Sequence, residues 1–148
     1  GQNLGAGKRD RVLKSYFIGI IYSFAAGAIL GGALFLFGKE FLSLFTNEAA
    51  VVEAGLLRTR IMCFSYAVSA FMDCTIAANR GIGKSLVPTI IVIMGSCVFR
   101  IVWIYTVFAH FHTIPSLYLL YIFSWTITAI AEIICFTVNY RKLETNKI

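Results

Sequence analysis

Three ionisable residues stand alone inside long apolar stretches of the sequence: Asp73, Arg100 and Glu132. A charged group in apolar surroundings is costly unless it meets an opposite charge, a bound ion or water. No nucleophile with a neighbouring base accompanies them, so their chemistry is that of ion and solute binding and we do not expect an enzyme. The four cysteines also lie in apolar stretches and form no C-x-x-C pair, so neither a metal site nor a disulfide framework is expected.

Polar neighbours repeat at helical spacing beside the two acids. Asp73 follows Ser69 by four residues, and Glu132 follows Thr128 by four residues. In a helix this spacing places each pair on one face. We therefore take Asp73, Glu132, Arg100, Ser69 and Thr128 as candidates for a substrate or cation pathway.

A structural ion pair between Arg100 and one of the two acids is the alternative. Asp73 and Glu132 each lie about seven to eight residues from one end of their apolar stretches, whereas Arg100 lies about fourteen residues into its own. At 1.5 Å per helical residue, this difference is roughly 10 Å of depth. Structural pairing and a role in transport both stay open at this point.

Four apolar segments must position these residues, at 15–38, 61–79, 86–109 and 116–140. Each holds no charge or a single one, and about 20 such residues suffice for a helix to cross a bilayer. Of the whole sequence, 59% is hydrophobic and 14% charged, with a mean hydropathy of +0.81, whereas soluble domains are about 25% charged. The sequence thus predicts an all-α polytopic transmembrane helix bundle of four spanning helices, surrounded by membrane lipid.

The net charge of +6 comes from basic residues that gather between the apolar segments. They are Lys8, Arg9, Arg11 and Lys14 before the first segment, Arg80 and Lys84 between the second and third, and Arg141, Lys142 and Lys147 after the fourth. Lys and Arg mark cytoplasmic loops, so both ends of the chain are predicted to be cytoplasmic. We interpret the basic residues as topology signals, and a nucleic acid partner is not expected.

Turn and cap residues mark the ends of the predicted helices. Thr46 or Asn47 is expected to cap a second helix that begins outside the membrane. Gly81 is expected to end that helix in a left-handed conformation, and Ser85 to cap the next one. Together these signals predict a tight hairpin between the second and third helices.

Small residues form a stripe along the first segment: Gly19, Ser23, Gly27 and Gly31, with Gly32 beside them. Such a stripe lets another helix approach closely. We expect it to serve packing within the bundle, with homodimerisation or a moving gate surface as the alternatives.

Two motifs flank the first two helices: G-Q-N-L-G-A-G-K at residues 1–8 and R-G-I-G-K-S at residues 80–85, followed by Pro88. Their characteristic residues are Gly1, Gln2, Gly5, Gly7, Arg80, Gly81, Gly83 and Pro88. With the leucine, phenylalanine and threonine of residues 41–46, they resemble the multidrug and toxic compound extrusion (MATE) family of antiporters. One branch of that family carries an acid about one turn before Asp73, where this chain has Ser69.

The resemblance implies a fold of twelve helices in two six-helix lobes, of which residues 1–148 look like the last four. The missing N-terminal part of the same transporter would then be a partner. The resemblance also implies secondary active export of organic cations, drugs or toxic metabolites in exchange for Na⁺ or H⁺, by alternating access and with no other cofactor. The implied location is the plasma membrane, as a bacterial inner-membrane protein.

Other kinds of membrane protein stay possible. A lipid-linked oligosaccharide flippase of the same superfamily would share the architecture. A non-transporting membrane subunit or an intramembrane enzyme would need a partner surface or a catalytic cluster. A four-helix small multidrug transporter would need a glutamate in the first helix, and segment 15–38 has none.

Overall fold

A computed structural model describes residues 1–145, apart from the side chains of Phe64 and Glu144. Lys147, one of the predicted topology signals, lies outside the described residues. The described chain is helical, with two π-helical segments, η1 and η2. In order, its elements are α1 (Gln2–Gly5), α2 (Arg9–Leu36), α3 (Gly38–Ser43), α4 (Ala49–Gly81), α5 (Leu86–Ile93), η1 (Met94–Val98), α6 (Phe99–Trp103), η2 (Ile104–Phe108), α7 (Ala109–Phe111) and α8 (Ile114–Thr145).

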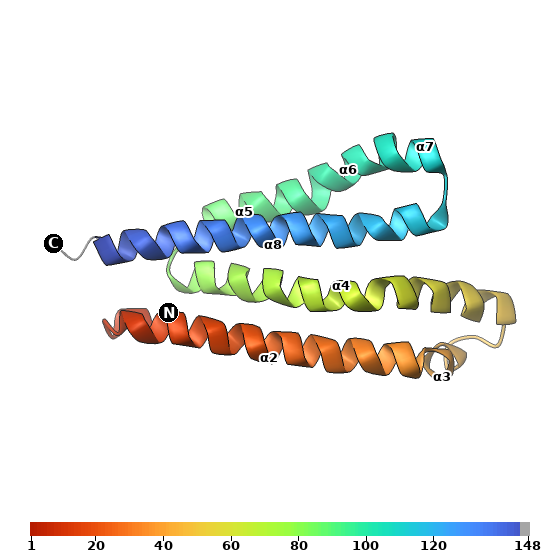
Figure 1. Cartoon of the computed structure of the whole chain (residues 1–148), viewed down its shortest axis with the longest axis horizontal. Helices are drawn as coiled ribbons and strands as arrows, with labels where there is room; N and C mark the ends of the chain where they lie inside the picture. The colour runs from red at the N-terminus through yellow and green to blue at the C-terminus, as the bar shows by residue number, and fades with distance from the viewer. Residues whose placement is uncertain (146–148) are drawn as a thin grey trace.

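The long helices lie side by side and run up and down (Figure 1). Helix α4 packs against α2 on one side and against α8 on the other, and α8 also packs against the run from α5 to η2. The order across the bundle is therefore α2, α4, α8 and then the α5–α7 run. This order makes the interface between α4 and α8 the middle of the fold.

Three of these helical stretches are long and apolar enough to cross a membrane: Arg9–Leu36, Leu86–Phe111 and Ile114–Leu143. Ala49–Cys63 and Ser65–Gly81, which meet at a bend of 50°, are long and apolar enough only when they are taken together, and they make a fourth span if they are counted as one. Large apolar side chains such as Ile21 and Ile134 are more than half exposed on the outer faces, which suits lipid contact. The predicted all-α membrane bundle is confirmed.

The first two long helices begin well before the apolar segments predicted for them, although α2 ends at Leu36, inside the segment 15–38. Helix α2 already begins at Arg9, and α4 begins at Ala49, as the predicted long second helix requires. Apolar composition marks the part of a helix that can cross the hydrocarbon, whereas polar residues continue the helix beyond it. This explains why the predicted segments 15–38 and 61–79 are shorter than the helices α2 and α4 that contain most of them.

The predicted caps are partly wrong. Gly83, with φ +81°, takes the left-handed conformation, while Gly81 is the last residue of α4. Ser85 precedes α5, but its side chain makes no capping hydrogen bond. Glu48 is the N-cap of α4, and its backbone N–H donates to the Thr46 hydroxyl at 3.2 Å. The hairpin itself lies between α4 and α5, where it was predicted.

The glycine stripe of α2 faces α4. A Cβ atom added at Gly27 would lie 3.3 Å from the carbonyl oxygen of Tyr66, and one added at Gly31 would lie 3.0 Å from that of Cys63. The two backbones approach so closely because glycine has no Cβ atom there. Packing within the bundle is therefore confirmed for this stripe. Gly32 is the exception, because a Cβ atom added there would meet nothing within 4 Å.

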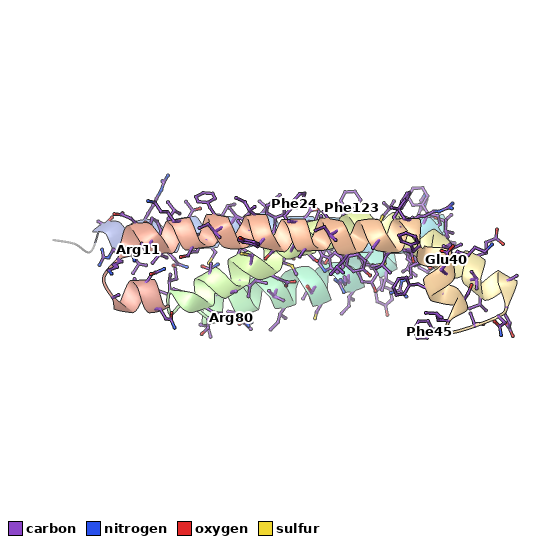
Figure 2. All side chains as sticks on the ribbon, turned by 90° about the horizontal axis from the view of Figure 1, so that it is seen from below. Arg11, Phe24, Glu40, Phe45, Arg80 and Phe123 are labelled. Carbon is purple, nitrogen blue, oxygen red and sulfur yellow. The ribbon has the colours of Figure 1, made fainter. Side chains whose placement is uncertain are left out.

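Charge separates the two ends of the bundle. Figure 2 shows Arg11 and Arg80 toward one end, and Glu40 with Phe45 at the opposite end. We call the first the basic end. The segments that carry the basic topology signals at the start of α2, after α4 and at the end of α8 meet there.

Candidate functional site

A buried carboxyl group lies between the two central helices. Glu132 of α8 is 0% exposed, and its Oε2 accepts a hydrogen bond of 2.9 Å from the side-chain amide of Asn79 in α4. The same amide nitrogen lies 3.3 Å from the backbone oxygen of Glu132. The other carboxyl oxygen, Oε1, is equally buried and has no hydrogen-bond partner in the described structure.

Two more polar side chains extend this group toward the basic end. The Asn139 amide donates to Oδ1 of Asn79 at 3.4 Å and to Sγ of Cys135 at 3.3 Å. We call Asn79, Glu132, Cys135 and Asn139 the Glu132 cluster. Sequence reasoning missed both asparagines, although Asn139 follows Glu132 by seven residues, a spacing that places it on the same helix face.

An apolar cluster lies one to two turns from Glu132, toward the basic end. The ring of Phe136 lies 4.3 Å from that of Tyr16 in α2, between centroids, and Ile82 and Tyr140 belong to the same buried group. The hydroxyl groups of Tyr16 and Thr75 are 2.9 Å apart and form a hydrogen bond. These contacts hold α2, α4 and α8 together beside the Glu132 cluster.

Asp73 lies elsewhere, on an exposed part of α4. With Ser69 and Tyr66 it lines a groove of about 610 Å³ between α4 and α2, where Ser23 and Gly27 form the facing wall. The Ser69 hydroxyl donates to the Tyr66 carbonyl oxygen at 2.9 Å. The groove therefore presents one carboxylate and an aromatic ring on its α4 side.

Arg100 projects from α6 onto α8. Its Nε donates to the Ser124 hydroxyl at 3.2 Å, and its guanidinium carbon lies 4.5 Å from the centre of the Tyr121 ring. No salt bridge within 4 Å joins Arg100 to Asp73 or Glu132 in the described chain. The ion pair considered from the sequence is thus not formed, in keeping with the difference in depth between these residues.

Thr128 has a packing position. It is 1% exposed, and its hydroxyl donates to the backbone oxygen of Ser124 at 2.7 Å. A Cβ atom added at Gly95 in η1 would collide with the Thr128 hydroxyl. The five predicted pathway residues thus fall into two groups. Three lie where α8 packs against its neighbours, namely Glu132, Thr128 and Arg100. The other two, Asp73 and Ser69, line the separate groove between α4 and α2.

The two glycine motifs meet at the basic end. A Cβ atom added at Gly81 would lie 3.3 Å from the backbone nitrogen of Gly1, and one added at Gly1 would lie 3.4 Å from the Gly81 oxygen. The Asn3 amide donates to the Ser15 hydroxyl at 2.9 Å, which fixes α1 on α2. A cavity of about 220 Å³ opens beside this contact. The two segments that define the motifs therefore form one structural unit.

The remaining motif residues surround this contact. Gln2 begins α1, Gly5 ends it, and Gly7 takes a left-handed φ of +70° in the turn to α2. Arg80 is exposed in the last turn of α4, and Pro88 is buried in the first turn of α5.

Comparison with known proteins gives a family match that covers both motifs. No curated protein sequence matches the chain. A model of the MatE family matches residues 1–106, which include both motifs, Asp73 and Arg100. The match covers more than two thirds of the chain and ends before α8. The chain belongs to the MatE (MATE) family, whose members are membrane transporters.

Proposed function

We propose that this chain belongs to a secondary active antiporter that exports organic cations, drugs or toxic metabolites in exchange for Na⁺ or H⁺ by alternating access. The observation that carries the coupling step is the unpartnered carboxyl oxygen of Glu132. Family membership supports transport as the activity. Two acidic residues, Glu132 and Asp73, support the ion-coupled mode.

Glu132 is a suitable site for the coupling ion. A carboxylate buried without a cation loses several kcal/mol of solvation, so it is stable only when it holds a proton or a metal cation. The Asn79 amide occupies Oε2 and leaves Oε1 available. Uptake of H⁺ or Na⁺ would stabilise the packing of α4 on α8, and its release would require water to reach Glu132. Glu132 would then bind the ion with different affinities in the two conformations, which is what ion coupling needs.

Asp73 is a suitable site for the exported cation. Its carboxylate lines the open groove of about 610 Å³ near the Tyr66 ring. A carboxylate attracts the positive charge of an organic cation, and an aromatic face adds a cation–π contribution. Ser69, at the position where one branch of the family has an acid, would contribute a hydroxyl instead.

The orientation follows from the charges. The basic end faces the cytoplasm, in the plasma membrane and by family resemblance in the bacterial inner membrane. Residues 1–148 form part of the second lobe, and the groove beside Asp73 faces the other helices of the transporter. The Asp73 carboxylate in this groove would be unfavourable if it faced lipid, which supports a helical partner on that side.

Transport by the full-length protein in proteoliposomes tests this proposal. A fluorescent organic cation is followed while a Na⁺ or an H⁺ gradient is imposed separately. We expect one gradient to drive cation movement, and Glu132→Gln to abolish the dependence on that gradient. Glu40→Gln is the matched control, because it removes an exposed carboxylate at the opposite end from Arg11.

Lack of movement with either gradient, in correctly inserted wild-type protein, would reject the antiporter. If that protein instead moved a lipid-linked oligosaccharide across the bilayer, the flippase would be the better assignment. Gradient-dependent export that Glu132→Gln leaves unchanged would remove Glu132 from the coupling site.

A further inference from the structure

The guanidinium group of Arg100 is held at one side and open at the other. Its Nε is occupied by the Ser124 hydroxyl at 3.2 Å. The Ser124 hydroxyl in turn donates to the backbone oxygen of Gly95 at 2.8 Å, so its lone pairs are directed at Arg100. The two terminal nitrogens of Arg100 make no hydrogen bond to any described residue. Four N–H groups in a planar arrangement are therefore available to an acceptor.

The charge of Arg100 has no counter-ion in the described part of the chain. Glu132 is engaged with Asn79, and Asp73 lies in the groove between α4 and α2. Arginine inside a membrane-spanning segment is unfavourable by about 2.5–3.5 kcal/mol even on the lenient insertion scale. An anion that came to the free side of the guanidinium would compensate for this.

Depth decides what kind of anion could do so. Arg100 is about fourteen residues into the helical run Leu86–Phe111, which is roughly 20 Å along a run of about 39 Å. The hydrocarbon core is about 30 Å thick, so the lipid headgroups lie roughly 15 Å from this position in either direction. A solute that enters the protein interior therefore fits the site, whereas a lipid phosphate does not reach it.

Two aromatic rings of α8 lie beside the guanidinium. Its carbon lies 4.5 Å from the centre of the Tyr121 ring and 6.0 Å from that of Trp125. The Trp125 ring continues to Tyr66 of α4 at a centroid distance of 6.3 Å. Tyr66 also lines the groove that contains Asp73. An aromatic surface thus leads from Arg100 toward that groove.

The backbone around Arg100 is unusual as well. Helix α6, which carries Arg100, has only five residues and lies between the π-helical segments η1 and η2. Single π-helical turns are rare in proteins, and many of those that do occur lie at functional sites. Gly95 and its contact with α8 lie in the first of these segments.

We propose that Arg100 binds the carboxylate or sulfonate group of an aromatic solute, with the solute's ring on Tyr121 and Trp125. The planar guanidinium can hold such a group through two parallel hydrogen bonds. This inference rests on the proposed transport function, because it names the residue that would hold an acidic group of the transported solute. Asp73 would then receive the cationic part of a substrate and Arg100 the acidic part.

Equilibrium binding to the full-length protein in neutral-lipid nanodiscs tests the inference. The probes are radiolabelled 1-naphthoate, the cation 1-naphthylmethylammonium and the neutral 1-naphthylmethanol, which share one ring system. We expect Arg100→Gln to weaken naphthoate binding at least tenfold and to leave cation binding unchanged. Arg100→Lys keeps the charge but loses the paired geometry, so an intermediate loss is expected. Arg11→Gln, an exposed arginine at the basic end, is the matched control.

Two results would overturn the inference. One is wild-type protein that binds naphthoate no more tightly than the neutral alcohol. The other is unchanged naphthoate binding in Arg100→Gln protein that still binds the cation. If Arg100→Gln does not fold, equal naphthoate affinity in Arg100→Lys and wild type has the same meaning. These measurements need no gradient, so failure of the antiport proposal is seen separately in the proteoliposome assay.

Discussion

The side-chain amide of Asn79 donates to both the carboxylate and the backbone oxygen of Glu132, over 2.9 and 3.3 Å. One residue of α4 therefore holds both the backbone and the side chain of α8 at the centre of the bundle. Asn139 donates to Oδ1 of Asn79, which fixes the orientation of that amide so that its nitrogen points at Glu132. The position of Glu132 thus depends on a polar contact that an apolar residue could not replace.

Removing one partner of the Asn79–Glu132 contact should lower the stability of the protein more than removing both. Asn79→Leu leaves the Glu132 carboxyl buried without any hydrogen bond, and we expect a loss of about 1–3 kcal/mol of stability. The double variant Asn79→Leu, Glu132→Leu removes both partners of this contact and leaves Asn139 its bond to Cys135, so most of the stability should recover while ion-coupled transport is lost. Melting temperatures of the purified full-length proteins check this. A double variant that melts no higher than Asn79→Leu would show that the contact does not determine stability.

Neighbouring glycines of α2 should respond in opposite directions to the same change. Gly31→Ala places a Cβ atom 3.0 Å from the Cys63 carbonyl oxygen, so we expect α2 and α4 to separate and stability to fall by about 1–3 kcal/mol. Gly32→Ala meets nothing within 4 Å and should raise stability by about 0.5–1 kcal/mol, because alanine favours helix. Thermal unfolding of the two variants makes the comparison. Equal shifts would mean that the close approach at Gly31 is not required.

The turn between α4 and α5 should need a residue that tolerates positive φ. Gly83 has φ +81°, so Gly83→Ala is expected to lose about 1–2 kcal/mol. Asparagine enters the left-handed region more readily, so Gly83→Asn should lose less. Gly5→Ala, in the partner motif with open space around it, is the control and should be nearly neutral. If Gly83→Asn and Gly83→Ala lose equal stability, backbone strain is not the cause.

Sequence periodicity predicted the helices, but it predicted only in part which residues share a buried or an exposed helix face. Ser69 and Asp73 were placed on one helix face, and Ser65 continues this row at the same spacing, yet Ser65 is fully buried and Asp73 is exposed. At about 100° per residue, a step of eight residues turns the helix by roughly 80° beyond two full turns, so the two ends of such a row point in different directions. A row at spacing four is therefore one face only over short distances.

Which helices become neighbours was not contained in local patterns. Asn79 and Glu132 are 53 residues apart in the sequence, and their contact depends on α8 packing against α4. Nothing in the spacing of either segment specifies that order. The glycine stripe, in contrast, was predictable because small residues at spacing four have a direct steric meaning. The π-helical segments around Arg100 had no signal that we recognised in the sequence.

Gly95 and Thr128 offer the sharpest test of whether α8 and η1 must be in contact. A Cβ atom at Gly95 would collide with the Thr128 hydroxyl, so Gly95→Ala should lose about 1–3 kcal/mol of stability. Thr128→Ala removes that hydroxyl and only one hydrogen bond within its own helix, so its own effect should be small. The Thr128→Ala change should therefore restore most of the stability that Gly95→Ala removes, although the Thr128 Cβ atom would still lie 3.1 Å away.

The same pair of variants separates packing from transport at Thr128. If Thr128 only packs, Thr128→Ala should export the organic cation at the wild-type rate while it rescues the melting temperature of Gly95→Ala. Thr137→Ala is the matched control, because the exposed Thr137 hydroxyl makes the same bond within α8 without facing η1. Slower export in Thr128→Ala with normal stability would place this hydroxyl in the solute pathway. A double variant no more stable than Gly95→Ala would mean that another contact, not the Thr128 hydroxyl, sets the distance between the two helices.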